Sequence, residues 1–103
     1  MKRYDKLVRD KIPQIIESDG KKYEIEKMKD REFKEYLKDK LLEETQEYIK
    51  SGDIEELADI LEVIKSILEE EKVEFEKLEE IRKKKAEKRG SFDQKIKLKK
   101  VHK

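Results

Sequence analysis

The chain has 103 residues, enough for one domain, and 53% of them are charged. It contains no cysteine, which excludes disulfide frameworks, thiolate metal sites and cysteine nucleophiles. No stretch has the length and apolarity of a membrane span or a signal peptide, so we expect a soluble cytoplasmic protein with a single domain over residues 1–103.

The net charge of +1 conceals two regions of opposite sign. Residues 82–103 contain 11 Lys or Arg against Glu87 and Asp93, a net charge of +9. The other 81 residues contain 17 basic and 25 acidic side chains, a net charge of −8. A basic tail on an acidic body can bind a polyanion. Nucleotide phosphates, a nucleic acid or the protein's own acidic helices each fit this pattern.

The first 28 residues have the weakest helical pattern. Asp10 and Pro13 predict a short helix that ends near Gly20, because a proline in the first turn lacks only an N–H that has no helical partner there. Alternating apolar and polar residues over 23–27 are a weak strand signal.

Three longer helices follow. The first is predicted from Asp30, as its N-cap, to Gly52, the expected left-handed terminator. The second opens at Asp53, has Glu56 three residues later as a capping-box partner, and ends near residue 70. The third spans roughly residues 73–89, as its apolar spacing indicates.

Gly90 is the expected end of the third long helix. Beyond it, Phe92, Ile96 and Leu98 are evenly spaced among polar residues, which predicts a short extended tail packed on the body. The predicted fold class is therefore all-α: a helical bundle of about three main helices with short extended N- and C-terminal segments.

Carboxylates fall on the apolar face of the first long helix. At 100° per residue, a stripe roughly 80° wide contains Phe33, Leu37, Leu41 and Tyr48. Glu44 lies near the middle of this stripe, about 20° from Leu37. Glu47 lies roughly 60° to one side, and Glu43 about 40° beyond it. Lys40 falls between Glu44 and Glu47, so an internal ion pair is one alternative for Glu44.

The second long helix repeats this arrangement. Nine of the fifteen positions from 54 to 68 are apolar, more than a surface helix needs. Glu56 falls inside the apolar stripe, and Asp59 lies at its edge. Two successive helices therefore each direct a carboxylate pair at i, i+3 spacing towards their apolar side.

Burial of an unpaired neutral polar group costs about 2 to 7 kcal/mol of folding free energy, and burial of an unpaired carboxylate costs more. Clustering of several carboxylates adds electrostatic repulsion between them. A hard divalent cation such as Mg²⁺, which binds oxygen ligands, offsets both the cost of burial and the repulsion. This group of side chains contains no imidazole and no thiolate, which disfavours Zn²⁺ and copper. Simpler alternatives stay open. Glu43, Glu55 and Glu62 can be solvent-facing residues, and Glu56 can be only a capping partner.

Three motifs resemble one known family. Residues 43–47 and 56–59 read EExxE and ExxD, residues 7–13 read LVRDKIP, and residues 82–92 read RKKKAxxRGxF. In this order the chain resembles the MazG-like and phosphoribosyl-ATP pyrophosphohydrolase-like group of all-α nucleoside triphosphate pyrophosphohydrolases. The resemblance covers residues 4 to about 98.

The resemblance implies a helical bundle completed by homo-oligomerisation, as a dimer or tetramer, that cleaves a nucleotide substrate between the α and β phosphates. Four residues would bind Mg²⁺, for which Mn²⁺ can substitute: Glu44, Glu47, Glu56 and Asp59. Glu43 would support these ligands or, with Glu44, help to activate water. Lys85 and Arg89 would contact phosphate.

A rival hypothesis from another class is a non-catalytic helical module that binds nucleotide, nucleic acid or protein through the basic C-terminal tail. Nucleic-acid binding is the weaker expectation, and no membrane partner is expected. A nucleic-acid binder would lose affinity steeply as salt is added.

Overall fold

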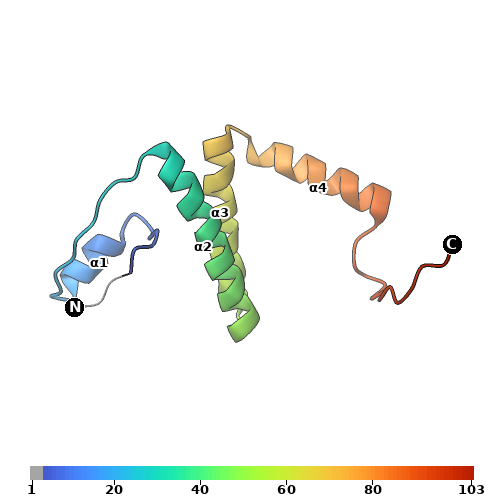
Figure 1. Cartoon of the computed structure of the whole chain (residues 1–103), viewed down its shortest axis with the longest axis horizontal. Helices are drawn as coiled ribbons and strands as arrows, with labels where there is room; N and C mark the ends of the chain where they lie inside the picture. Colours follow the sequence, from blue (N-terminus) through green and yellow to red (C-terminus); the bar gives the residue numbers. More distant parts are fainter. Residues whose placement is uncertain (1–3) are drawn as a thin grey trace. The chain divides into compact units, whose positions relative to one another are not determined.

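The computed structural model describes residues 4–103, which contain four α-helices and no β-strand. The helices are α1 (Ile12–Ser18), α2 (Asp30–Ser51), α3 (Ile54–Glu71) and α4 (Phe75–Arg89) (Figure 1). The predicted all-α class is confirmed. None of the helices in the described part is long and apolar enough to cross a membrane. The chain divides into two compact units at Lys72, so α4 belongs to a different unit from the other three helices.

The described part of the first unit opens with an irregular segment, followed by the short helix α1. Pro13 lies in the first turn of α1, as predicted. Gly20 adopts a φ of 78°, and its N–H donates to the Glu17 carbonyl at 2.9 Å, which ends the helix. The weak strand signal at 23–27 is wrong, since these residues have no regular secondary structure. A lone strand would leave its backbone groups without partners.

Helices α2 and α3 form an antiparallel hairpin and lie side by side (Figure 1). Its turn is made at Gly52, which has a left-handed φ of 71° and donates its N–H to the Tyr48 carbonyl at 2.7 Å. This is the terminator that the sequence predicts. At the other end α2 begins at Asp30 itself, and Lys29 is the N-cap in place of Asp30.

The predicted capping box at the start of α3 is wrong. Asp53 is the N-cap, but its side chain makes no capping hydrogen bond. Instead the Asp53 N–H donates to Ser51 Oγ at 3.1 Å, and the Glu56 N–H donates to the Asp53 backbone carbonyl at 3.1 Å. The Glu56 carboxylate therefore has no capping role and is available for other contacts.

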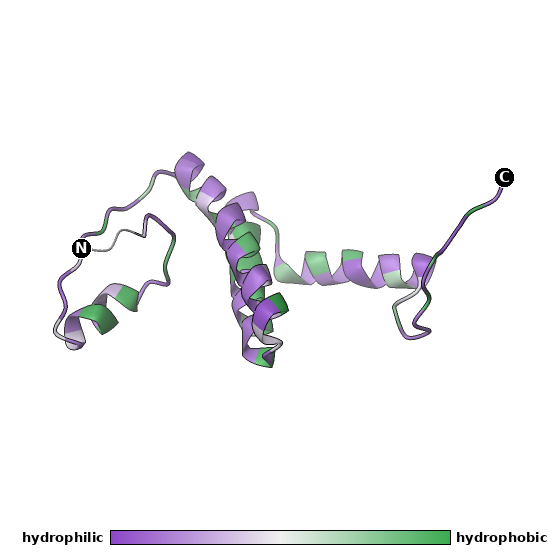
Figure 2. Ribbon diagram, turned by 60° about the horizontal axis from the view of Figure 1, so that its bottom comes forward, coloured by the Kyte–Doolittle hydropathy of each residue, from purple (hydrophilic) through white to green (hydrophobic). Residues whose placement is uncertain are grey.

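The hairpin has a small core and a large apolar surface. In the described residues only Leu37 and Val63 are buried, at 2% and 8% exposure. Hydrophobic positions recur between hydrophilic ones along both helices (Figure 2). Large apolar side chains of the hairpin that stay exposed are Leu42, Ile49, Ile54, Leu57 and Leu61. One copy of the chain therefore leaves much of its amphipathic surface in contact with water.

The second unit consists of α4 and the residues that follow it. Ion pairs one turn apart run along α4, including Lys84 with Glu80 at 3.3 Å. Gly90 follows the helix as its C-cap, as predicted. The apolar residues of the tail are exposed within this unit, Phe92 at 96% and Ile96 at 80%. Packing of the tail on the body stays a prediction.

Candidate metal site

Three carboxylates converge where α2 and α3 meet. Glu44 comes from α2, and Glu56 and Asp59 come from α3. One carboxylate oxygen of each lies within 4.8 Å of the other two, and all three residues are half-buried. The i, i+3 spacing places Glu56 and Asp59 on one face of α3, and the turn at Gly52 folds that face towards Glu44. Three of the four predicted metal ligands are thus brought together.

Glu44 has both a basic partner and acidic neighbours. Its side chain is 13% exposed, in agreement with its place within the apolar stripe of α2. Lys40 Nζ lies 3.3 Å from a Glu44 oxygen and 3.1 Å from a Glu43 oxygen. The ion pair that the sequence offered as an alternative therefore forms, yet it does not remove Glu44 from the carboxylate cluster.

The crowding of negative charge affects the pKa of Glu56. Partial desolvation raises the pKa of Glu56, and the charges of Asp59, Glu47 and Glu44 raise it further. A shared hydrogen bond with Asp59 acts in the same direction. The folded chain therefore makes it harder for Glu56 to ionise, which is the condition that a bound cation relieves.

The remaining predicted acidic residues take different positions. Glu47 is exposed and is not part of the converging group, although its charge reaches Glu56. Desolvation acts to raise the pKa of Glu43, but hydrogen bonds from Lys6 and Lys40 outweigh it and leave this pKa below its usual value. Glu43 is therefore a stable anion between two ammonium groups.

Two basic residues at this site were not singled out from the sequence. Lys6 Nζ lies 3.1 Å from Glu43 Oε1, and Arg9 Nη2 lies 2.6 Å from Asp59 Oδ1. Both lie in the segment before α1: Arg9 belongs to the LVRDKIP motif, and Lys6 directly precedes it. The motif was the only signal that could have drawn attention to this segment, because the partners of the two residues lie 37 and 50 positions later in the chain.

The donor set fits a hard divalent cation. Oxygens bound to one Mg²⁺ at about 2.1 Å lie roughly 3 to 4 Å apart, so small side-chain rotations bring this group to binding distance. The two acidic motifs contain five carboxylates, with which three basic side chains pair: Lys6, Arg9 and Lys40. Within residues 4–103, the two carboxylates of these motifs without a basic partner are Glu56, which belongs to the converging group, and Glu47, which lies outside it.

The predicted phosphate contacts lie on α4. Lys85 and Arg89 are exposed side chains of the second unit, whereas the carboxylate cluster belongs to the first. Neither makes an ion pair with another described residue. Their role in phosphate binding stays a prediction.

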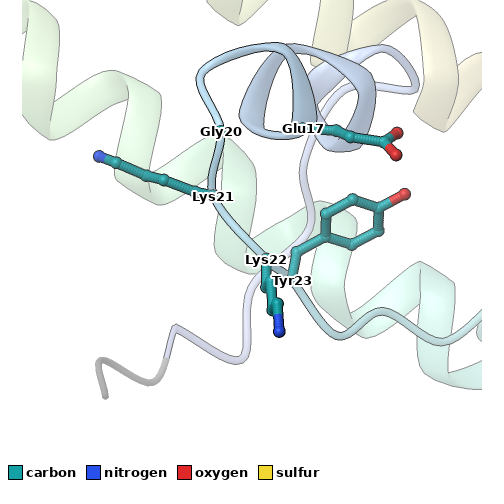
Figure 3. Close-up of a pocket in the computed structure, with 5 residues that line it drawn as sticks. All are labelled: Glu17, Gly20, Lys21, Lys22 and Tyr23. Atoms are coloured by element: carbon teal, nitrogen blue, oxygen red, sulfur yellow. The ribbon is translucent and has the colours of Figure 1, made fainter.

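Two hollows of the surface lie away from the carboxylates. An open depression beside the end of α1 is lined by Glu17, Gly20, Lys21, Lys22 and Tyr23 (Figure 3). In it the carboxylate of Glu17 and the ring of Tyr23 point to the same side, and Lys21 points away from them (Figure 3). A smaller hollow of about 140 Å³ lies between α2 and α3, near Leu37 and Ile67. Neither contains a predicted site residue.

No known protein family, curated protein or solved structure matches the chain.

Proposed function

We propose that this protein is a Mg²⁺-dependent nucleotide pyrophosphohydrolase, which cleaves a nucleoside triphosphate or related nucleotide between the α and β phosphates. The observation that supports this most directly is the convergence of Glu44, Glu56 and Asp59 from two helices. The EExxE and ExxD motifs that supply them resemble those of the all-α pyrophosphohydrolases. Removal of damaged nucleotides is one role that such an activity can serve.

Each acidic residue has a distinct part in this proposal. Glu44, Glu56 and Asp59 hold the cation, and Glu47 joins them by a rotation of its exposed side chain. The bound Mg²⁺, or Mn²⁺ in its place, polarises phosphate oxygens and lowers the pKa of a bound water. Phosphoryl transfer needs positioning and charge neutralisation more than covalent help from the protein, so no side-chain nucleophile is required.

The supporting role of Glu43 is favoured over that of a general base. Its lowered pKa makes the carboxylate a weak proton acceptor at neutral pH. Its contacts with Lys6 and Lys40, each 3.1 Å, instead orient two cations beside the metal ligands. Glu44 contacts Lys40 at 3.3 Å and belongs to the converging group, so it is the better placed of the two to orient a water beside the cation that this group would hold.

We also propose that the chain is a homo-oligomer. Leu42 and Ile49 lie seven residues apart on one face of α2, and Ile54, Leu57 and Leu61 form a stripe on α3. All five side chains are at least 40% exposed in a single copy. Two buried side chains are a small core for the described residues 4–103, so burial of this stripe against a second hairpin would supply the missing apolar contacts.

The decisive test of the enzyme is release of pyrophosphate from a panel of canonical and modified nucleoside triphosphates with Mg²⁺. Glu44→Gln keeps the size of the side chain and removes one metal ligand, whereas Glu55→Gln makes the same change at an exposed position of α3. We expect Glu55→Gln to keep activity and Glu44→Gln to lose it. Turnover of no nucleotide, or full activity of Glu44→Gln, refutes the proposal.

The alternative of a binding module is favoured by one observation, the exposure of every basic side chain from Arg82 to Lys103. A basic tail of this kind binds a polyanion with an affinity that falls steeply with salt. Removal of residues 91–103 takes away five of the eleven basic side chains of this region and keeps the carboxylate cluster, so it should weaken polyanion binding without removing a candidate metal ligand. The binding module is favoured if the truncated chain loses nucleic-acid binding and the full chain hydrolyses no nucleotide.

A further inference from the structure

The segment before α1 brings two cations to the carboxylate cluster. Lys6 pairs with Glu43 of α2 at 3.1 Å, and Arg9 pairs with Asp59 of α3 at 2.6 Å. These contacts close chain loops of 37 and 50 positions. They tie the segment to both helices of the hairpin, at the place where the three candidate metal ligands converge.

These ion pairs are too exposed to serve mainly as structural links. The side chains of Lys6 and Arg9 are 42% and 55% exposed, and ion pairs open to water contribute little to stability. Arg9 uses one of its nitrogens on Asp59, and its side chain makes no other hydrogen bond or ion pair with the described residues. Most of its five N–H donors therefore face solvent at the edge of the site.

A triphosphate that approaches this cluster meets strong repulsion unless cations compensate for it. Asp59 would offer Arg9 less negative charge with Mg²⁺ at the converging carboxylates, and the guanidinium would then gain more from a phosphate, which it can bind through two parallel hydrogen bonds. Lys6 stands beside Glu43 in the same way and offers an ammonium group that rotates easily. Both residues belong to the same unit as the metal ligands.

We propose that Lys6 and Arg9 bind the phosphate groups of the nucleoside triphosphate, exchanging Glu43 and Asp59 for phosphate oxygens when Mg²⁺ and nucleotide enter the site. This proposal rests on the proposed function and assigns a role to the LVRDKIP segment. In the metal-free protein the two pairs keep the cations in position. In the loaded protein the same cations neutralise phosphate charge that the metal does not reach.

The test measures binding apart from turnover. Calorimetry with an α,β-methylene triphosphate analogue and Mg²⁺ gives the affinity for nucleotide, and calorimetry with Mg²⁺ alone gives the affinity for the metal. Arg9→Ala and Lys6→Ala should each weaken analogue binding about 10- to 100-fold, as loss of a charge-assisted hydrogen bond does. Arg9→Ala should leave Mg²⁺ binding equal to or tighter than that of the wild type, because Asp59 is then released.

Two further variants serve as controls. Arg31→Ala removes an exposed arginine from the first turn of α2, about 20 Å along the helix from Glu44, and should change neither affinity. Arg9→Lys keeps the charge without the fork and should recover part of the analogue affinity. Circular dichroism shows whether each variant is folded before its affinity is compared.

The possible results are distinct. Wild-type affinity for the analogue in both Arg9→Ala and Lys6→Ala overturns the inference even if the protein is an active pyrophosphohydrolase. Equal losses of Mg²⁺ and analogue binding in a folded Arg9→Ala protein also overturn it, because they show a structural role. Loss of analogue binding alone supports it. If the wild type binds the analogue through these residues but hydrolyses no nucleotide, the proposed activity fails and the phosphate site stands. If the wild type binds no analogue, both fail.

Discussion

Replacement of Glu44 by glutamine isolates the contribution of the metal from that of the fold. The substitution keeps the shape of the side chain, removes one ligand charge and leaves Lys40 in contact with Glu43 at 3.1 Å. Lys40 pairs with both Glu43 and Glu44, and the variant loses only the second pair. Without metal, its unfolding free energy should therefore lie within about 1 kcal/mol of that of the wild type. Added Mg²⁺ should stabilise the wild type more than the variant.

The expected size of the effect follows from linkage between binding and unfolding. At a Mg²⁺ concentration 100 times the dissociation constant, binding stabilises the wild type by about 2.7 kcal/mol. In a domain of this size that raises the unfolding midpoint by roughly 10 to 20 °C. If loss of a ligand weakens binding about 100-fold, the same concentration stabilises Glu44→Gln by about 0.4 kcal/mol, or roughly 2 to 3 °C.

Thermal unfolding followed by circular dichroism, with EDTA and then with increasing Mg²⁺, measures these midpoints directly. Glu55→Gln is the matched control, since it removes one carboxylate from an exposed position of the same hairpin and should keep the full Mg²⁺ response. An equal rise of the midpoint in Glu44→Gln and wild type would show that Mg²⁺ does not bind at the converging carboxylates. A wild type with no response to Mg²⁺ would refute the reasoning altogether.

Three other substitutions test the charge, the core and the apolar surface. The pKa of Glu56 in the folded protein is raised above its ordinary value of 4.5, so the metal-free protein loses stability as the pH rises through the raised pKa. Glu56→Gln cannot ionise and should therefore unfold at a higher temperature than wild type at pH 7 in EDTA. A lower midpoint for Glu56→Gln, measured by circular dichroism across this pH range, contradicts the assigned repulsion. Leu37→Ala should lower the unfolding free energy by about 2 to 5 kcal/mol in urea titrations, because Leu37 is only 2% exposed, and a loss below about 1 kcal/mol would show that the hairpin core lies elsewhere. Leu61→Asp places a charge on the exposed stripe of α3 and should reduce the molar mass from that of an oligomer to that of a monomer in light scattering, whereas an unchanged mass would remove the stripe from the interface.

The helices and their ends are the features that local sequence predicts well. Gly52 and Gly90 mark the ends of α2 and α4, and Pro13 marks the first turn of α1, because each acts on its own backbone and immediate neighbours. The errors are also local. The Asp53 side chain does not cap α3, and residues 23–27 form no strand because they have no second strand with which to pair.

The orientation of individual carboxylates was predicted only in part. Helical periodicity placed Glu44, Glu56 and Asp59 towards apolar faces, and the structure brings these three together. Glu47 has the same i, i+3 relation to Glu44, yet its side chain is exposed and lies outside the group. A helical projection gives the direction in which a side chain leaves its own helix. The position of the partner helix decides which side chains of the two helices come together.

The sequence by itself therefore determined the helical class, the turn between α2 and α3 and the acidic character of their facing surfaces, since these depend on residues within one or two helical turns. Only the tertiary structure decided which charges far apart in the sequence compensate one another. Lys6 and Arg9 reach Glu43 and Asp59 across 37 and 50 positions, and such contacts depend on the return of a whole segment over the hairpin. The local periodicity of the sequence does not predict the course of this segment. Each charged side chain is equally compatible with water until the fold brings a partner to it.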